Sequence, residues 1–295
     1  MFFKKLWKDR VSWFMMLPYL FFYVLMILIP AIASIVLGFT YFNMFSSPVF
    51  VGFDNFTRMF LHDDVFITAL GNTLLAALIV GPGGYLLSFI LAWMINDMGR
   101  KLRVFLTFIF YAPSISGSAY VIWSFIFSAD SYGVVNNFLL RWGFIDTPLL
   151  FFQDEKMALG LVVLVQLWLS LGVGFLAFVA GLQNLDPSLS EAGAVDGIRD
   201  RWQELWYITL PQMKPMLLFG AVTQIAAAFS VGPVSQILCG LPSVNYSAHT
   251  LWLHALDYGS LRYQMGYAGA VCVVVFLLVL LTYKLANFAL SRVGN

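Results

Sequence analysis

Long apolar runs limit the fold of this chain more than any other feature of its sequence. Several exceed the ~20 apolar residues with which a helix crosses the hydrocarbon core of a bilayer. Charged residues make up 11% of the chain, against about 25% in soluble domains. A transmembrane β-barrel would instead show short segments of alternating hydrophobicity. The sequence therefore predicts an all-α membrane protein.

Six transmembrane helices are predicted. The first apolar run is much longer than the apolar core of a signal peptide, about 7–15 residues, so we interpret it as a retained span. Residues 1–12 are predicted to form an N-terminal tail, 13–291 a single transmembrane domain and 292–295 a C-terminal tail. The predicted spans are 13–41, 66–95, 104–127, 157–182, 216–238 and 265–288.

Two glycine–proline clusters lie within these spans. Gly81-Pro82-Gly83-Gly84 lies within the second span, where neighbouring helices or a water-lined cavity must satisfy the freed backbone groups. Gly232-Pro233 lies near the outer end of the fifth span. It either forms part of a gate or simply kinks the helix.

The distribution of Lys and Arg predicts the orientation of the chain. If the N-terminus is inside, the inner segments hold twelve of these residues and the outer loops four. Positive charge collects on the cytoplasmic side, so both termini are predicted to be cytoplasmic. The outer loops 42–64, 128–156 and 241–263 are rich in aromatic residues. These aromatics form either interfacial belts or a surface that receives an external partner.

Several kinds of site are missing from the sequence. No Asp or Glu lies in the middle of a predicted span, which disfavours proton coupling and favours a neutral substrate. The phosphate-binding loop of an ATPase is also absent. Cys239 and Cys272 have no metal-ligand spacing, and His62, His249 and His254 are expected to be surface residues without a catalytic or metal role.

Residues 186–211, here named the coupling loop, form a charged excursion between the fourth and fifth spans. Asp186 and Pro187 are typical of a helix start, and Ser188-x-x-Glu191 fits a capping box. Gly197 can adopt the left-handed conformation that ends one helix and redirects the chain. A second helix is predicted to follow as far as Pro211.

The coupling loop resembles the EAA loop of ATP-binding-cassette importer permeases, E-A-A-x₃-G-x₉-I-x-L-P. The matching residues are Glu191, Ala192, Gly197, Ile208, Leu210 and Pro211. Asp196 before the glycine is similar to the carbohydrate-uptake, maltose-type branch. The loop departs from the pattern in having Gly193 at the third position. It also has ten residues, not nine, between Gly197 and Ile208, which predicts either a local bulge or a shifted helical phase in the second helix.

The resemblance implies a function for the coupling loop. In that family the loop is a coupling helix seated in a cleft of an ATPase subunit. Glu191 would make the ionic contact, Gly197 the turn, and Ala192 and Gly193 would permit close approach. Asp196, Ile208, Leu210 and Pro211 complete the implied coupling set. The alternative is that Glu191 only caps a helix.

The resemblance also implies partners and a location. These are a second, similar permease, two cytoplasmic ATPase subunits that bind ATP and Mg, and an external solute-binding protein. The chain itself is expected to bind no cofactor, no metal and no nucleic acid. It is expected to be a multi-pass protein in the lipid of a prokaryotic plasma membrane.

Polar and aromatic residues within the spans are candidates for the substrate pathway. Amides and hydroxyls hydrogen-bond sugars, and aromatic faces stack on them. The candidates are Gln166, Gln224, Phe229, Trp168, Tyr111 and Asn72. Each has an alternative role, in which the amides only form hydrogen bonds between helices and the aromatic residues only pack in the core or face lipid.

We interpret the chain as the permease subunit of an ATP-driven, binding-protein-dependent oligosaccharide importer, and not as an enzyme. Two alternatives stay open. One is an importer permease for another neutral solute. The other is a stand-alone, ion-coupled secondary transporter, which would transport without ATP in vesicles that hold an ion gradient.

Overall fold

The computed structural model describes residues 10–291. The predicted tails, 1–12 and 292–295, therefore lie almost wholly outside the described residues. The described part divides into two compact units, one within Met1–Asp63 and Ala255–Val274 and the other within Asp64–His254 and Val275–Asn295. Helices dominate both, which confirms the predicted all-α fold class.

The first unit holds one long helix, a small hairpin and parts of the outer loops. Its leading helix is continuous from α2 through a π-helical stretch into α3. The part Trp13–Leu37 is long and apolar enough to cross a membrane. A two-stranded antiparallel sheet and helix α4 follow. The elements before the second unit are α2 (Arg10–Tyr23), π-helix Val24–Leu28, α3 (Ile29–Leu37), β1 (Thr40–Tyr41), β2 (Val49–Phe50) and α4 (Asp54–Leu61).

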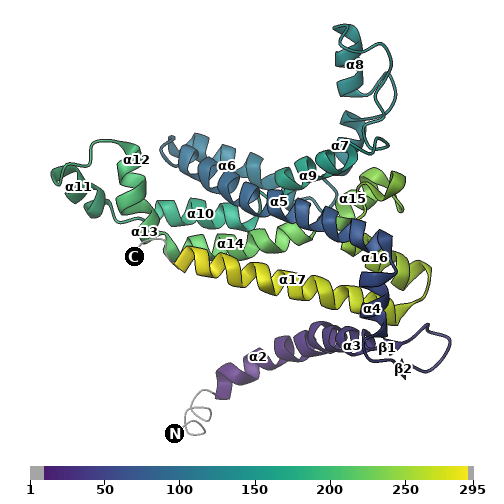
Figure 1. Ribbon diagram of the computed structural model, residues 1–295. Coiled ribbons are helices and arrows are strands. Elements are labelled where there is room, and N and C mark those ends of the chain that lie inside the picture. The colour runs from purple at the N-terminus through teal and green to yellow at the C-terminus, as the bar shows by residue number, and fades with distance from the viewer. Residues whose placement is uncertain (1–9, 292–295) are drawn as a thin grey trace. The chain divides into compact units, whose positions relative to one another are not determined.

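The second unit is a bundle around the long helix α5 (Asp64–Asn96), which packs against α6, α9, α10 and α14 (Figure 1). Pro82 lies inside α5 without ending it. The elements up to the coupling loop are α6 (Arg100–Ile115), α7 (Val121–Ile126), α8 (Val134–Arg141), α9 (Ala158–Leu169) and α10 (Val173–Gln183).

The coupling loop and the segments after it complete the chain. The coupling loop contains α11 (Pro187–Val195), α12 (Arg201–Glu204), π-helix Leu205–Thr209 and the start of α13 (Leu210–Gln212). The later elements are α14 (Lys214–Phe229), α15 (Gly232–Cys239), the 3₁₀ turn Val244–Tyr246, α16 (Leu251–Leu256), π-helix Asp257–Leu261 and α17 (Met265–Ser291).

The number of long helices differs from the number of predicted spans. Among the described residues, four helices are long and apolar enough to cross a membrane, and five if the bent pair α9–α10 counts as one span. The predicted third span, 104–127, is not one helix. Ser116-Gly117-Ser118 are turn-forming residues and separate α6, which is 16 residues long, from the short α7. Six spans therefore remain a prediction.

Two other interruptions lie inside predicted spans. The predicted fourth span bends by 40° between Leu169 and Val173. The predicted fifth span breaks between Phe229 and Gly232, which confirms an interruption next to Pro233.

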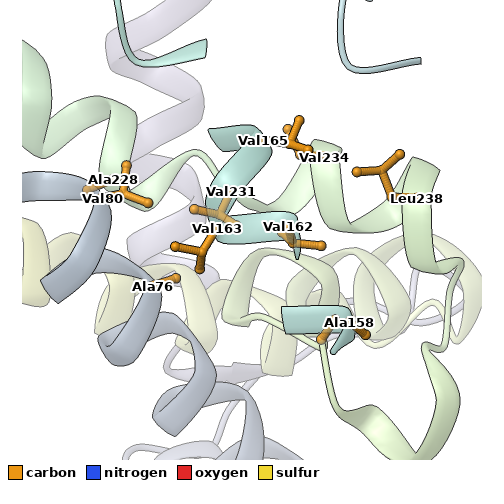
Figure 2. Packing of buried hydrophobic residues seen from close by; sticks show 11 residues of the cluster. Ala76, Val80, Ala158, Val162, Val163, Val165, Ala228, Val231, Val234 and Leu238 are labelled. Carbon is orange, nitrogen blue, oxygen red and sulfur yellow. The ribbon is translucent and has the colours of Figure 1, made fainter. Parts of the chain in front are cut away.

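Two apolar clusters form the core of the second unit. The first gathers alanines and valines from α5, α9, α14 and α15, and Figure 2 shows them close together. The second is more aromatic and includes Phe89, Phe175 and Phe178. Along α5 the first cluster uses Ala76 and Val80, and the second begins at Phe89. A short stretch of α5 therefore separates the two.

Candidate coupling loop and substrate pocket

The first helix of the coupling loop starts as predicted, at Asp186 and Pro187. The Asp186 carboxylate accepts a hydrogen bond from the Ser188 N–H at 3.0 Å. Hydrogen bonds from the N–H and the side chain of Ser188 lower the pKa of Asp186. The predicted Ser188–Glu191 capping box is wrong, because α11 begins before Ser188 and places it inside the first turn.

Gly197 makes the turn between the two arms of the coupling loop. Its φ of +96° is the left-handed conformation that glycine adopts without steric cost. The Ile198 N–H donates to the Gly193 carbonyl at 2.9 Å, and the Gly197 N–H to the Ala194 carbonyl at 3.4 Å. Together these bonds close the end of α11 in a Schellman motif.

The second arm contains the predicted bulge. Asp200 caps α12 by accepting hydrogen bonds from the N–H groups of Trp202 and Gln203. The helix then widens into a π-helical turn over Leu205–Thr209. A π-bulge is the usual way in which a helix takes up one extra residue. The additional residue between Gly197 and Ile208 therefore lies in this turn.

The two arms pack against each other. Gly193 is buried, and a Cβ added to it would lie 2.5 Å from Cδ1 of Ile208. The Ser190 hydroxyl donates to the Glu204 carboxylate at 2.7 Å. Two residues of the motif, Gly193 and Ile208, are thus in direct contact, and the small residue at the third position permits it.

The outer surface of the coupling loop carries charge beside apolar side chains. Glu191 is exposed and makes no hydrogen bond or ion pair with any residue in the described range. Ala192 and Asp196 are also exposed. Beyond the turn, Trp206 and Tyr207 expose 63% and 74% of their surface. An exposed apolar patch next to charged groups is typical of a protein interface.

The coupling loop is fastened to the end of α5. Arg201 forms an ion pair with Asp97, and its guanidinium lies 5.1 Å from the centre of the Trp93 ring. The rings of Trp93 and Trp202 lie 5.1 Å apart. Sequence reasoning missed Trp93 and Asp97, although the position of Asp97 directly after an apolar span was a signal.

A polar contact in the middle of the bundle centres on Gln224 of α14. Its Nε2 donates to the Ser88 hydroxyl at 3.1 Å and to the Ser170 carbonyl at 2.9 Å. Ser170 lies at the bend between α9 and α10, and its carbonyl also accepts a hydrogen bond from the Gly172 N–H at 2.8 Å. We name Ser88, Ser170 and Gln224 the polar hub.

Gly84 explains why the glycine-rich cluster of α5 matters to the polar hub. A Cβ on Gly84 would lie 2.5 Å from the Ser170 hydroxyl and 2.7 Å from Oε1 of Gln224. Only a residue without a side chain leaves room for both. The missing side chain at Gly84 therefore lets α5 approach Ser170 and Gln224 closely.

A pocket of about 360 Å³ lies beside the polar hub, between α5, α14 and the C-terminal part of α17. Its lining is mostly apolar, with Gln224 the buried amide among its residues. The Oε1 atom of Gln224 is buried and accepts no hydrogen bond from the described residues. The lining residues are Ala77, Gly81, Pro82, Tyr85, Ala221, Gln224, Ile225, Ala228, Phe229, Thr282, Leu285, Ala286 and Ala289.

The structure brings only two of the six candidate pathway residues together in this pocket. Gln224 and Phe229 both line it. Gln166 is buried elsewhere and donates to the Ala227 carbonyl at 2.8 Å. The remaining three, Asn72, Trp168 and Tyr111, lie at other places in the bundle.

Each of those three has a neighbour of its own. The Asn72 amide donates to the carbonyls of Tyr246 and His249 at 3.0 and 2.9 Å. Trp168 packs edge-to-face on Trp123, with ring centres 5.6 Å apart. Tyr111 lines a separate groove between α6 and α10. Asn72 thus makes the interhelical type of bond that was the alternative to a pathway role.

The expectation that all three histidines are surface residues is wrong for two of them. His62 is exposed, but His249 and His254 are buried, with ring centres 5.6 Å apart. The segment 243–254 folds back against α5, which encloses both rings. No cluster of His, Cys, Asp and Glu suited to a metal ion occurs among the residues in 10–291 that were described.

Comparison with known proteins identifies the family. Residues 84–292 match the family described as "Binding-protein-dependent transport system inner membrane component". The chain belongs to this family. The matched range includes the coupling loop, the polar hub and most of the pocket, so the resemblance to importer permeases is confirmed. The chain is accordingly a transport subunit and not an enzyme. It is a multi-pass protein of the inner membrane.

Two relatives match this permease over nearly its whole length. It is 31% identical to the probable ABC transporter permease protein YesP of Bacillus subtilis (strain 168), over 95% of this chain and 92% of the relative. It is 30% identical to the lactose transport system permease protein LacF of Rhizobium radiobacter, over 93% and 92%.

A crystal structure shows the same fold. The structure is that of a bacterial alginate ABC transporter in complex with an alginate pentasaccharide-bound periplasmic protein. One of its chains superposes on this permease with a TM-score of 0.80 and 24% identity, over 99% of this chain and 98% of that chain. At this identity the match supports the fold.

Proposed function

We propose that this permease forms half of the translocation pathway of an importer for carbohydrates, oligosaccharides in particular. The substrate class is supported by the lactose permease among its relatives. It is also supported by the pocket, where the Gln224 amide lies among apolar walls and the rings of Tyr85 and Phe229. Such a surface suits a sugar, which presents hydroxyl groups at its edge and C–H groups on its faces. Another neutral solute is the second candidate, because an apolar pocket without charge does not require hydroxyls.

The coupling loop docks on a separate ATPase subunit that binds ATP and Mg. The observation that carries this proposal is the exposed Glu191, held by a capped and internally packed loop beside the exposed Trp206 and Tyr207. A rigid loop of this kind transmits force without deforming. The attachment of Arg201 and Trp202 to the end of α5 would pass that force into the bundle.

The arrangement of the second unit agrees with the predicted orientation. Helices α11 and α12 lie beyond one end of its bundle and α8 beyond the other (Figure 1). The excess of Lys and Arg in the inner segments assigns the end with α11 to the cytoplasm. The implied assembly contains a second permease, two ATPase subunits and an external solute-binding protein, with both termini of this chain inside.

Glu191→Ala tests the docking role. Truncating one partner of a buried interfacial charge pair costs about 2–5 kcal/mol. We therefore expect the variant to insert and fold normally but to lose most of the co-purifying ATPase and of ATP-dependent uptake. Glu155→Ala, in an outer loop, is the control and should leave both intact. Full recovery of the ATPase and of uptake with Glu191→Ala would reject the docking role.

A second experiment separates this proposal from a stand-alone secondary transporter. The purified chain is placed in ATP-free vesicles with a proton or sodium gradient, and solute entry is measured. We expect no entry until the ATPase, ATP and the other subunits are added. Gradient-driven entry with this chain alone would overturn the proposal.

A further inference from the structure

A groove of about 400 Å³ runs along α6 and is closed on one side by α10. The residues from α6 are Arg100, Arg103, Val104, Thr107, Phe108 and Tyr111. Their spacing follows one face of a helix. From Arg100 to Tyr111 this face extends about 16 Å, at about 1.5 Å per residue. The groove is therefore elongated along α6.

The groove is polar at one end. Arg100 and Arg103 stand at the start of α6, and Gln183 at the end of α10 lies on the same side. Arg103 uses Nη1 to donate to the Asn96 carbonyl at 2.8 Å. Arg100 is exposed and has no hydrogen bond or ion pair within the described part of the chain. The nearby carboxylate of Asp97 is already paired with Arg201.

The remainder of the groove is mostly apolar, with Thr107 and Tyr111 as its polar residues. Val104 and Phe108 follow the arginines along α6, and Val179 lies one turn before Gln183 on α10. Val104 and Phe108 are exposed, which is costly in water and ordinary in lipid. The charge distribution of the chain predicts that the end of the groove with Arg100 and Arg103 lies at the cytoplasmic surface. The apolar part of the groove then extends into the bilayer.

We propose that this groove binds one anionic phospholipid. Its phosphate lies against Arg100 and Arg103, Gln183 donates to its glycerol region, and one acyl chain runs over Val104 and Phe108. Basic pockets between transmembrane helices on the cytoplasmic side bind anionic headgroups in this way. A transmembrane helix of a partner fits the groove less well, because it would cover two arginines without supplying a negative charge.

Lipid retention in the assembled transporter tests the proposal. The complex is reconstituted in nanodiscs of phosphatidylglycerol and phosphatidylcholine, and the lipids that stay bound are measured by native mass spectrometry. We expect retained phosphatidylglycerol to fall about tenfold or more in Arg100→Gln/Arg103→Gln, at about 1 kcal/mol for each lost charge. Lys101→Gln is the matched control, since Lys101 is adjacent but does not line the groove, and it should change retention less than about twofold.

A photo-crosslinker at position 108 identifies the occupant directly. The proposal requires an adduct with the mass of a phospholipid, formed more often with phosphatidylglycerol than with phosphatidylcholine. Inorganic phosphate alone should not displace it, because the acyl chain supplies the remaining affinity. A polypeptide adduct, equal labelling by both lipids or displacement by phosphate alone would each overturn the proposal. These outcomes do not depend on the solute that is transported.

Discussion

The coupling loop and the polar hub are built in opposite ways. The hydrogen bonds that form the caps and the turn of the coupling loop join residues close in the sequence, such as Asp186 to Ser188 and Ile198 to Gly193, and its printed contacts with α5 come from Arg201 and Trp202. The polar hub joins Gln224 to Ser88 and Ser170, which are 136 and 54 residues away. The coupling loop therefore keeps its form by local rules, whereas the polar hub exists only when the bundle is assembled. Substitutions in the polar hub should therefore destabilise the whole bundle, whereas substitutions in the coupling loop should act locally.

The largest effect is expected at Gly84, within the polar hub. In Gly84→Ala the new Cβ meets Ser170 and Gln224 at 2.5 and 2.7 Å, so the hub must open. Overpacking of this kind costs about 1–3 kcal/mol. Thermal inactivation of the detergent-solubilised complex measures the loss. Gly71→Ala on the same helix has open space around it and should be neutral or slightly stabilising. Equal stability of the two variants would show that the hub is not rigid.

The second-largest effect is expected for Gln224→Ala. This variant separates a structural role of the amide from contact with the substrate. It removes the hydrogen bonds that the amide donates to the Ser88 hydroxyl and to the Ser170 carbonyl, at about 0.5–1.5 kcal/mol for each bond. If the amide also touches the solute, the KM for uptake should rise more than the loss of stability explains. Ser88→Ala is the control, because Ser88 bonds the same amide but does not line the pocket. The same KM for both variants would remove Gln224 from the pathway and leave only its structural role.

Gly197→Ala should have a smaller effect that is confined to the coupling loop. The left-handed conformation at φ +96° costs an alanine roughly 1–2 kcal/mol. We expect weaker ATPase association in a pull-down but unchanged thermal stability of the transmembrane part. Gly99→Ala, which has no positive φ, is the control. A drop in the stability of the whole bundle would contradict the local character of the coupling loop.

The smallest effect is expected for Gly193→Ala. The added Cβ meets only the flexible ends of Ile208 and Ile198, at 2.5 and 3.0 Å, so small shifts can relieve the contact. We expect a cost below about 1 kcal/mol and less than about a twofold change in uptake. Ile208→Val should restore any loss. A severe defect that Ile208→Val does not relieve would mean that Gly193 itself touches the ATPase.

Much of the coupling loop was predictable from the sequence. The cap at Asp186, the turn at Gly197 and the bulge before Ile208 follow from single residues and their spacing. The capping box failed because two residues, Asp186 and Ser188, compete for one helix start, and Asp186 with Pro187 behind it prevailed. The burial of His249 and His254 could not be predicted, because it depends on α5, far away in the chain.

The sequence by itself determined the environment and the local turns of this protein. Runs of apolar residues demand a bilayer, charge asymmetry predicts an orientation, and caps and glycines act through neighbouring backbone groups. Only the tertiary structure decided where helices bend and which polar residues meet. At the bend the Ser170 carbonyl accepts a hydrogen bond from the Gln224 amide of α14, so neither residue reveals its role alone. Hydrophobicity is a property of each side chain, whereas a buried hydrogen bond is a property of a pair.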